Sequence, residues 1–249
     1  MARAAAEVST ASSETSQSLL EVEDLHTDIG QHHILQGVSL RVRADAVTVL
    51  LGRNGAGKTT TMRTIMSLLR PRRGRVRFDG REIHHLPPYE VARLGIGYVP
   101  EGQGIFATLT VDENLRVARL TEDARARARL DHIFALFPDL ARFRQARAGT
   151  LSGGQKQMLS IARAFINPNR LLLIDEPSKG LAPIIVEHLV DALRTMKRQA
   201  TVLLVEQNFP MAEALGDDFY LIDDGRTVHQ GAMADLAADH ALKKKYLGV

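Results

Sequence analysis

The chain has no cysteine among its 249 residues, which excludes disulfide bonds and thiolate metal sites and suits a reducing compartment. It also lacks an apolar run of roughly 18 residues, so we expect no segment to span a bilayer. Lys and Arg (32) barely outnumber Asp and Glu (29), and this balance gives no argument for nucleic acid binding. With 45% hydrophobic residues, the chain can bury one large core, or a core with a satellite subdomain.

The first 18 residues are rich in Ala, Ser, Thr and Glu and show no apolar periodicity, so we predict a disordered N-terminal extension over residues 1–18. The run Ala4-Ala5-Ala6 is too short for the apolar core of a secretory signal. No internal repeat is evident, so each motif below occurs once in the chain.

Alternating patterns on both sides of residue 52 predict half-exposed strands. Apolar and polar residues alternate over residues 20–23 and 38–43, and arginines alternate with apolar residues over 75–78. We therefore expect an antiparallel subdomain in which Arg75 and Arg77 form a solvated face. Near the C-terminus, Asp224-Gly225 predicts a hairpin turn between strands at 219–222 and 227–230.

Residues 52–59 fit the phosphate-loop pattern G-x-x-x-x-G-K-[ST] at every fixed position. A short apolar run at 47–51 predicts a buried strand before the loop, and Met62, Ile65, Met66 and Leu69 have helical spacing after it. These flanks argue against the alternative of a merely flexible glycine turn. Such a loop points backbone N–H groups at phosphate oxygens, and the helix dipole adds positive charge. We expect the triphosphate to contact Gly52, Arg53, Asn54, Gly55, Ala56, Gly57, Lys58, Thr59 and Thr60.

An apolar run at residues 171–174 delivers two carboxylates, Asp175 and Glu176, to the carboxyl end of a second predicted strand. Ligands of open α/β sheets bind at such strand ends. We expect Asp175 to hold Mg²⁺ together with the Thr59 hydroxyl, and Glu176 to polarise the attacking water. An Asp-Glu pair alone also fits a helix-capping turn, but the phosphate loop upstream favours the catalytic interpretation.

The segment Leu-Ser-Gly-Gly-Gln at residues 151–155 precedes a helical pattern formed by Met158, Ile161, Ala162 and Phe165. Its hydroxyl and free backbone N–H groups can form a second anion site. The same residues are equally typical of an ordinary helix cap, and the sequence leaves both possibilities open.

These three motifs, in this order, resemble those of the nucleotide-binding subunits of ABC transporters, and the resemblance covers residues 19–249. It implies an α/β P-loop cassette with a mixed central sheet flanked by helices, an antiparallel β subdomain, and a helical subdomain over about residues 105–160. A continuous helical pattern over residues 123–140 belongs to that subdomain. The resemblance also implies ATP hydrolysis and assigns Ser152, Gly153, Gly154 and Gln155 to the γ-phosphate of the opposite subunit.

Several positions depart from the general family pattern. Glu101 stands where the family offers Gln to Mg²⁺ and the attacking water, and Gln207 where it has a His that contacts the γ-phosphate. Three segments resemble those of the branched-chain amino acid type of importer ATPase: V-P-E-G at residues 99–102, G-L-A-P at 180–183 and V-E-Q-N at 205–208. Relatives of that subgroup also take part in the transport of urea and short amides. Because Gln207 cannot carry an imidazolium charge, we expect slower hydrolysis or a stronger dependence on Glu176.

Ile29 occupies the place of an aromatic residue that stacks on adenine in the family. The stacking contribution of about 1 kcal/mol would be lost, so we expect weaker adenine binding or weaker base selectivity. The histidine pairs His32-His33 and His84-His85 fall in predicted loops, where we expect exposed side chains rather than metal ligands.

The resemblance implies a peripheral protein on the cytoplasmic face of the cell membrane. Its expected partners are a sibling ABC ATPase in a heterodimer, two membrane permease subunits and, indirectly, a solute-binding protein, with no nucleic acid. The loop at residues 101–109 offers hinges and apolar side chains for coupling to the permease. Two alternatives are a soluble ABC ATPase that acts on ribosomes or nucleic acid, and a weakly hydrolysing regulatory cassette. Soluble ABC ATPases of the first kind generally carry two cassettes or a long coiled-coil insertion, and neither is evident in this sequence.

Overall fold

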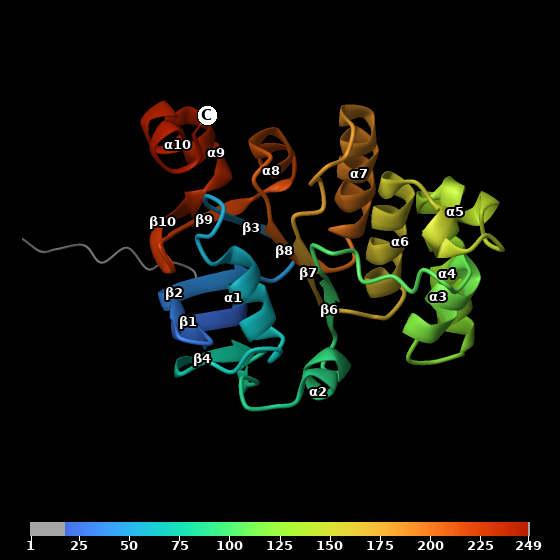
Figure 1. Ribbon diagram of the computed structural model, residues 1–249, viewed down its shortest axis with the longest axis horizontal. Coiled ribbons are helices and arrows are strands. Elements are labelled where there is room, and N and C mark those ends of the chain that lie inside the picture. The colour runs from blue at the N-terminus through green and yellow to red at the C-terminus, as the bar shows by residue number, and fades with distance from the viewer. Residues whose placement is uncertain (1–17, 249) are drawn as a thin grey trace, which may run out of the picture.

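Two β-sheets organise residues 18–248, the part of the chain that the computed structural model describes (Figure 1). The predicted disordered extension lies outside these residues, apart from Ser18, which begins the first strand. The smaller sheet is antiparallel and has the order β2-β1-β4-β5. Its strands are β1 (Ser18–Ile29), β2 (His32–Arg43), β4 (Arg73–Phe78) and β5 (Arg81–Glu82).

Charge pairing across the antiparallel sheet explains its arginines. In the register of β1 and β4, Arg77 lies opposite Glu21 and Arg75 opposite Glu23. Arg77 forms ion pairs with both glutamates, and Arg75 pairs with Glu23 at 3.2 Å. Leu20, by contrast, points into the core and is fully buried. The predicted antiparallel subdomain with a solvated arginine face is therefore confirmed.

The larger sheet has the order β10-β9-β3-β8-β7-β6 and is parallel except for its last hairpin. Every residue of β3, β7 and β8 is buried, as their continuous apolar sequences predict. Asp224 and Gly225 form the predicted hairpin turn, both with positive φ. The strands are β3 (Val47–Leu51), β6 (Ile96–Val99), β7 (Leu171–Asp175), β8 (Thr201–Val205), β9 (Asp218–Asp223) and β10 (Arg226–Ala232).

Helices cover the central sheet, and α3 to α6 gather at one end of the molecule (Figure 1). Within residues 18–248, no helix is long enough and apolar enough to cross a membrane. The helices are α1 (Lys58–Ile65), α2 (Pro88–Arg93), α3 (Val111–Ala118), α4 (Ala124–Leu136), α5 (Pro138–Arg142), α6 (Gly153–Phe165), α7 (Pro183–Met196), α8 (Phe209–Leu215), α9 (Met233–Ala238) and α10 (His240–Tyr246), with a short 3₁₀ turn η1 (Ala148–Thr150) before α6.

Two helix predictions need correction. The helix after the phosphate loop ends at Ile65, because Ser67 adopts a left-handed conformation with φ 55°, and the half-buried Leu69 lies beyond it. The single helix expected over residues 123–140 is two, α4 and α5, because Pro138 has no N–H to continue α4 and instead starts α5.

The central sheet separates two hydrophobic cores. Val49 and Leu51 of β3 face the core shared with α6 and α7, whereas Leu50 faces the core shared with α1 and the antiparallel sheet. This burial on both sides fixes the parallel strands, and with them the positions of their carboxyl ends. Because β3, β7 and β8 are neighbours in the sheet, the residues that follow them are brought together at one edge.

Candidate active site

The phosphate loop occupies the turn between β3 and α1, and glycine is required at both of its ends. Gly52 has φ 151°, and a Cβ there would lie 2.2 Å from the Ile222 carbonyl oxygen. Gly57 has φ 107°, and a Cβ there would lie 2.8 Å from the Leu35 side chain. In the middle of the loop, Gly55 faces open space. The loop is therefore tightly packed at Gly52 and Gly57 and open at Gly55, which leaves room for a phosphate group beside its backbone.

Lys58 is held inside this loop. Its side chain is only 4% exposed, and its Nζ donates hydrogen bonds to the Gly52 carbonyl at 2.8 Å and the Arg53 carbonyl at 3.0 Å. Glu176 Oε1 lies 3.5 Å from the same nitrogen. Burial lowers the pKa of Lys58, while the nearby carboxylate of Glu176 opposes that shift. The ammonium group is thus held between the loop carbonyls and the Glu176 carboxylate.

Thr59 and Asp175 bring two oxygen ligands together. The Thr59 hydroxyl donates to Asp175 Oδ1 at 3.2 Å, and the Tyr98 hydroxyl donates to Asp175 Oδ2 at 3.4 Å. Burial raises the pKa of Asp175 to about 6, and the hydrogen bond from Thr59 opposes the shift. A hydroxyl beside a buried carboxylate is a donor set that fits Mg²⁺, whose positive charge would favour the ionised carboxylate.

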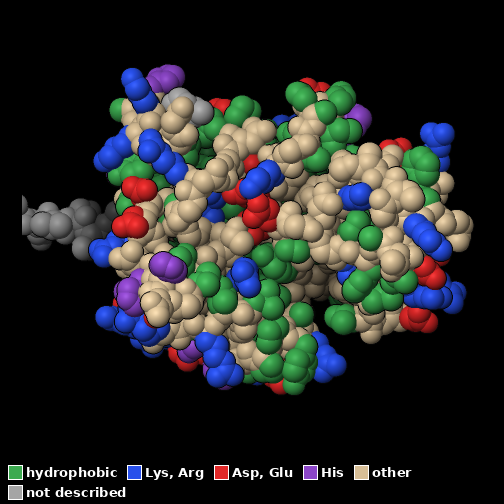
Figure 2. Space-filling view, viewed as in Figure 1, with side chains coloured by type: hydrophobic (Ala, Val, Ile, Leu, Met, Phe, Trp, Pro, Cys, Tyr) green, Lys and Arg blue, Asp and Glu red, His purple; other side chains and the backbone are tan. Residues whose placement is uncertain are grey.

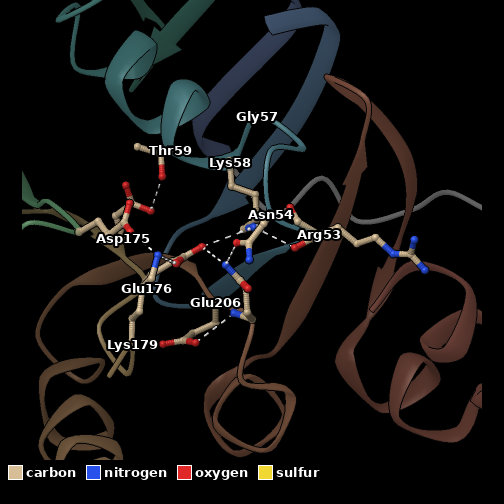
Figure 3. Close-up of polar contacts among 12 residues, drawn as sticks. Arg53, Asn54, Gly57, Lys58, Thr59, Asp175, Glu176, Lys179 and Glu206 are labelled. Carbon is tan, nitrogen blue, oxygen red and sulfur yellow. Dashed lines mark hydrogen bonds and ion pairs between the residues drawn. The ribbon is translucent and has the colours of Figure 1, made fainter. Parts of the chain in front are cut away.

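Glu176 is buried and has a strained backbone. Its φ is 47°, which is uncommon for a residue other than glycine, and its N–H donates to the Val205 carbonyl at 2.9 Å. Its Oε1 accepts a hydrogen bond from Gln207 Nε2, and its Oε2 lies 3.5 Å from Lys179 Nζ (Figure 3). The strained backbone and these contacts aim the carboxylate at the loop that holds Lys58.

Glu206 anchors the backbone of Gln207, a role that its place in the motif V-E-Q-N does not predict. Its buried carboxylate accepts hydrogen bonds from the Ser178 N–H and hydroxyl and from the backbone N–H groups of Gln207 and Asn208. Burial raises the pKa of Glu206, and these donors oppose that shift. A charged residue directly after a fully buried strand was the available signal.

Gln207 links the strand ends to the phosphate loop. Besides its bond to Glu176, its Nε2 donates to Asn54 Oδ1. The Arg53 side chain points away from the site and donates to the Lys245 carbonyl at 3.1 Å, so only the Arg53 backbone faces Lys58 (Figure 3). Gln207 therefore joins the phosphate loop to the Glu176 carboxylate.

A cavity of about 280 Å³ lies against the phosphate loop and the Glu176 side chain, whereas Asp175, Glu206 and Gln207 are not among its lining residues. Figure 2 shows acidic and basic side chains together in the hollow at the centre of the visible face. The cavity is lined by Ile34, Asn54, Gly55, Gly57, Lys58, Thr59, Thr60, Glu101, Glu176 and Lys179. Ile34 and Lys179 were not among the predicted site residues. Ile29 ends β1 with 40% of its surface exposed. Glu101 lies at the rim, where it is ion-paired with Lys179.

The turn at residues 152–155 is placed differently. Ser152 caps α6 by accepting a hydrogen bond from the Gln155 N–H, and the Gln155 side chain accepts one from the Ser152 N–H. Gln155 Nε2 also donates to Asp139, and Gln103 donates to the Gly153 carbonyl. Ser152 and Gly153 are exposed, whereas Gly154 packs on Ile185. The cap alternative is confirmed, and the anion site stays a prediction.

The histidine pairs lie on the antiparallel subdomain. His32 and His33 are exposed as predicted, but they belong to β2 rather than to a loop. Ligand atoms of Glu82, His84 and His85 lie within 4.8 Å of one another, and His84 is half-buried. Glu82 is 3.7 Å and 3.9 Å from two arginines, so its carboxylate already has cationic neighbours.

The fold and the site define the class of protein. A phosphate loop between a buried parallel strand and a helix, facing a carboxylate pair at the end of another strand, is the arrangement of a P-loop nucleoside triphosphatase. The family model "ABC transporter" matches residues 35–179, more than half of the chain, and the chain belongs to this family. Its members are ATP-binding, ATP-hydrolysing cassettes that work with membrane permease components.

Two relatives are similar over most of the chain. The "high-affinity branched-chain amino acid transport ATP-binding protein BraG" of Pseudomonas aeruginosa is 38% identical and covers 92% of this chain and 100% of its own length. The "probable branched-chain amino acid transport ATP-binding protein LivF" of Archaeoglobus fulgidus is 35% identical, with 93% and 99% covered. These relatives confirm the resemblance drawn from the motifs.

A solved structure confirms the fold. An "ATP binding subunit of ABC transporter" superposes with a TM-score of 0.80 at 31% identity, covering 93% of this chain and 97% of that one. The predicted α/β cassette, with a mixed central sheet and an antiparallel subdomain, is therefore correct.

Proposed function

We propose that this chain is the ATP-hydrolysing subunit of an importer for branched-chain amino acids or a related small solute, such as an amide or urea. The observation that supports this most is its similarity to BraG, which covers all of that protein at 38% identity. The motifs at Glu101, Gly180 and Gln207 agree with the same type of ATPase.

In the proposed reaction, the water oxygen bonds to the γ-phosphorus as the bond to the bridging oxygen of ADP breaks. One proton of the water passes to the Glu176 carboxylate, and the other stays on the phosphate oxygen. Glu176 accepts a hydrogen bond from this water and so orients it for attack. Lys58 and the loop N–H groups bind the phosphates, and Gln207 donates a hydrogen bond to a γ-oxygen. Thr59 and Asp175, with Glu101 at the rim, would hold Mg²⁺, which neutralises charge on the triphosphate.

The remaining half of the site is proposed to come from another subunit. Ser152 and Gly153 are exposed at the N-terminus of α6, where an anion is favoured. We assign residues 152–155 to the γ-phosphate that a sibling ATPase binds, in a heterodimer. Two permeases and a solute-binding protein complete the assembly, the chain lies on the cytoplasmic face of the membrane, and nucleic acid has no role.

We also propose the domain division. The cassette spans residues 19–249, and its helical subdomain covers about residues 105–160. The four helices α3 to α6 in this range pack on one another, and α6 then runs on to the central sheet. This places the Ser152 turn on the helical subdomain, away from the phosphate loop.

Reconstitution tests this proposal. The chain would be combined in proteoliposomes with a sibling ATPase, two permeases and a solute-binding protein of a branched-chain amino acid importer. We expect ATP hydrolysis that the binding protein stimulates, and uptake of labelled leucine or a short amide that ceases with Glu176→Gln. Hydrolysis that responds to ribosomes or nucleic acid instead would contradict the proposal. Equal transport by two copies of this chain without the sibling would contradict the heterodimer.

A further inference from the structure

We propose that Lys179 is a positioning residue that ties the loop carrying Glu101 to the catalytic carboxylate of Glu176. The inference rests on the proposed function, because it assigns Lys179 a part in the same hydrolytic step. The Lys179 amino group lies beside Glu176 (Figure 3) and also forms an ion pair with Glu101.

The geometry of Lys179 is that of a bridge. Its Nζ lies 2.5 Å from Glu101 Oε1 and 3.5 Å from Glu176 Oε2. Glu176 Oε1, the other oxygen, faces Lys58 and Gln207. The two oxygens of the catalytic carboxylate are thus held from two sides, and Lys179 also reaches the neighbouring acidic side chain. Without this cation, Glu101 would lose its ion pair, and among the described residues Glu176 would keep only Lys58 as a cationic neighbour.

The backbone of Lys179 is fixed, although the side chain of this residue is 58% exposed. Its N–H donates to the Glu176 carbonyl at 3.2 Å, and the preceding Ser178 is anchored by its N–H and hydroxyl to the buried Glu206. The backbone therefore holds Lys179 beside Glu176 whether or not the side chain is paired. The ion pair between Lys179 and Glu101 additionally restrains the Glu101 side chain.

The loop that follows Glu101 reaches the helical end of the molecule. Gln103 and Gly104 both have positive φ, so the chain folds back sharply there. Gln103 Nε2 donates to the Gly153 carbonyl at 3.3 Å, and Arg163 donates to the Gly104 carbonyl. A continuous line of contacts thus runs from α6 through this loop to Glu101, Lys179 and Glu176. A shift of α6 against the sheet would reach the catalytic carboxylate along it.

Amide hydrogen exchange of the full-length, nucleotide-free chain tests the bridge without any transport assay. We expect Lys179→Met and Glu101→Gln each to raise exchange in residues 102–106 by about 1.5- to 5-fold, the range that one exposed ion pair supports. The double variant should match either single variant, since one contact is lost in all three. Lys197→Met is the matched control, because it removes an ion pair to Asp217 at the far end of α7. Exchange in residues 102–106 that is unchanged, or equally raised by Lys197→Met, would overturn the inference.

Turnover of the reconstituted transporter tests the catalytic consequence. We expect Lys179→Met to lower kcat by about 5- to 10-fold with KM for ATP nearly unchanged, and Lys179→Arg to restore most of the rate. A KM change with constant kcat would overturn the positioning role, since it would mean that Lys179 binds nucleotide instead. If the wild-type transporter hydrolyses no ATP, the proposed function fails and the catalytic role of Lys179 fails with it, whereas the exchange result still decides the bridge.

Discussion

The phosphate loop at residues 52–59 and the serine–glycine turn at residues 152–155 both suit a phosphate group, yet their surroundings differ. Lys58 is only 4% exposed and lies within reach of Glu176, and Thr59 contacts Asp175. Ser152 is exposed, and the polar contacts of its turn go to its own helix, Asp139 and Gln103. The phosphate loop finds its polar partners within the chain, whereas Ser152 and Gly153 face outward. This difference agrees with the proposal that residues 152–155 contact a nucleotide held by another subunit.

The largest expected effect concerns Glu176, beside the phosphate loop. Glu176→Gln should lower ATP turnover by about 10²- to 10⁴-fold, because the amide cannot orient and polarise water as a carboxylate does. ATP affinity should change little, since Lys58 and the loop keep their contacts. Steady-state hydrolysis and calorimetric binding measure the two effects. Glu213→Gln, at an exposed position of α8, is the matched control. Turnover at the wild-type rate would remove Glu176 from the mechanism.

The next prediction concerns the exposed turn at residues 152–155. A Cβ at Gly153 would meet no atom within 4 Å, so Gly153→Asp should fold normally. Its carboxylate would repel a γ-phosphate, and we expect turnover of the assembled transporter to fall by about 10²-fold. ATP binding by the isolated chain should be unaffected. Gly153→Ala, with no charge, should retain most of the activity. If Gly153→Asp weakened ATP binding by the isolated chain, the two halves would act within one subunit.

A smaller effect is expected from the buried Asp175. Its pKa of about 6 exceeds the ordinary value of 3.8, so the folded chain binds this proton more tightly than the unfolded chain. Wild-type stability should therefore fall as pH rises from about 4 to about 7, and Asp175→Asn should escape this loss. Without nucleotide and metal, the variant should be more stable by on the order of 1–3 kcal/mol at pH 8 and less so at pH 5. Urea unfolding at both pH values measures this, and a pH-independent difference would contradict it.

The smallest expected effect concerns the binding of the adenine base of ATP. Ile29 is 40% exposed at the end of β1, so a larger ring fits there without disturbing the core. Ile29→Phe should tighten ATP binding by about 1 kcal/mol, or about fivefold, if adenine stacks at this position. Calorimetry with ATP and with inorganic triphosphate separates the base from the phosphates. Equal tightening of both ligands would place adenine elsewhere, for example against Ile34, which lines the cavity.

The local parts of the site were predictable from the sequence, and its cross-connections were not. The phosphate-loop pattern determines a strand, a turn and a helix in succession, and Asp175-Glu176 follow a strand whose burial the apolar run already indicates. The contact of Gln207 with Asn54 joins residues 153 positions apart, and the Lys179–Glu101 pair joins residues 78 apart. Such contacts depend on which strands are neighbours in the sheet, which periodicity does not reveal. The break between α4 and α5 was visible at Pro138, but the apolar spacing outweighed it.

The most direct measurement is a structure of the assembled transporter with ATP bound and Glu176→Gln in this chain. Ser152 Oγ is expected within about 3 Å of a γ-phosphate oxygen on the nucleotide that the phosphate loop of the sibling ATPase holds. Lys58 of this chain should contact the other nucleotide. A Ser152 hydroxyl beyond hydrogen-bonding distance of every γ-phosphate would contradict a site shared between two subunits.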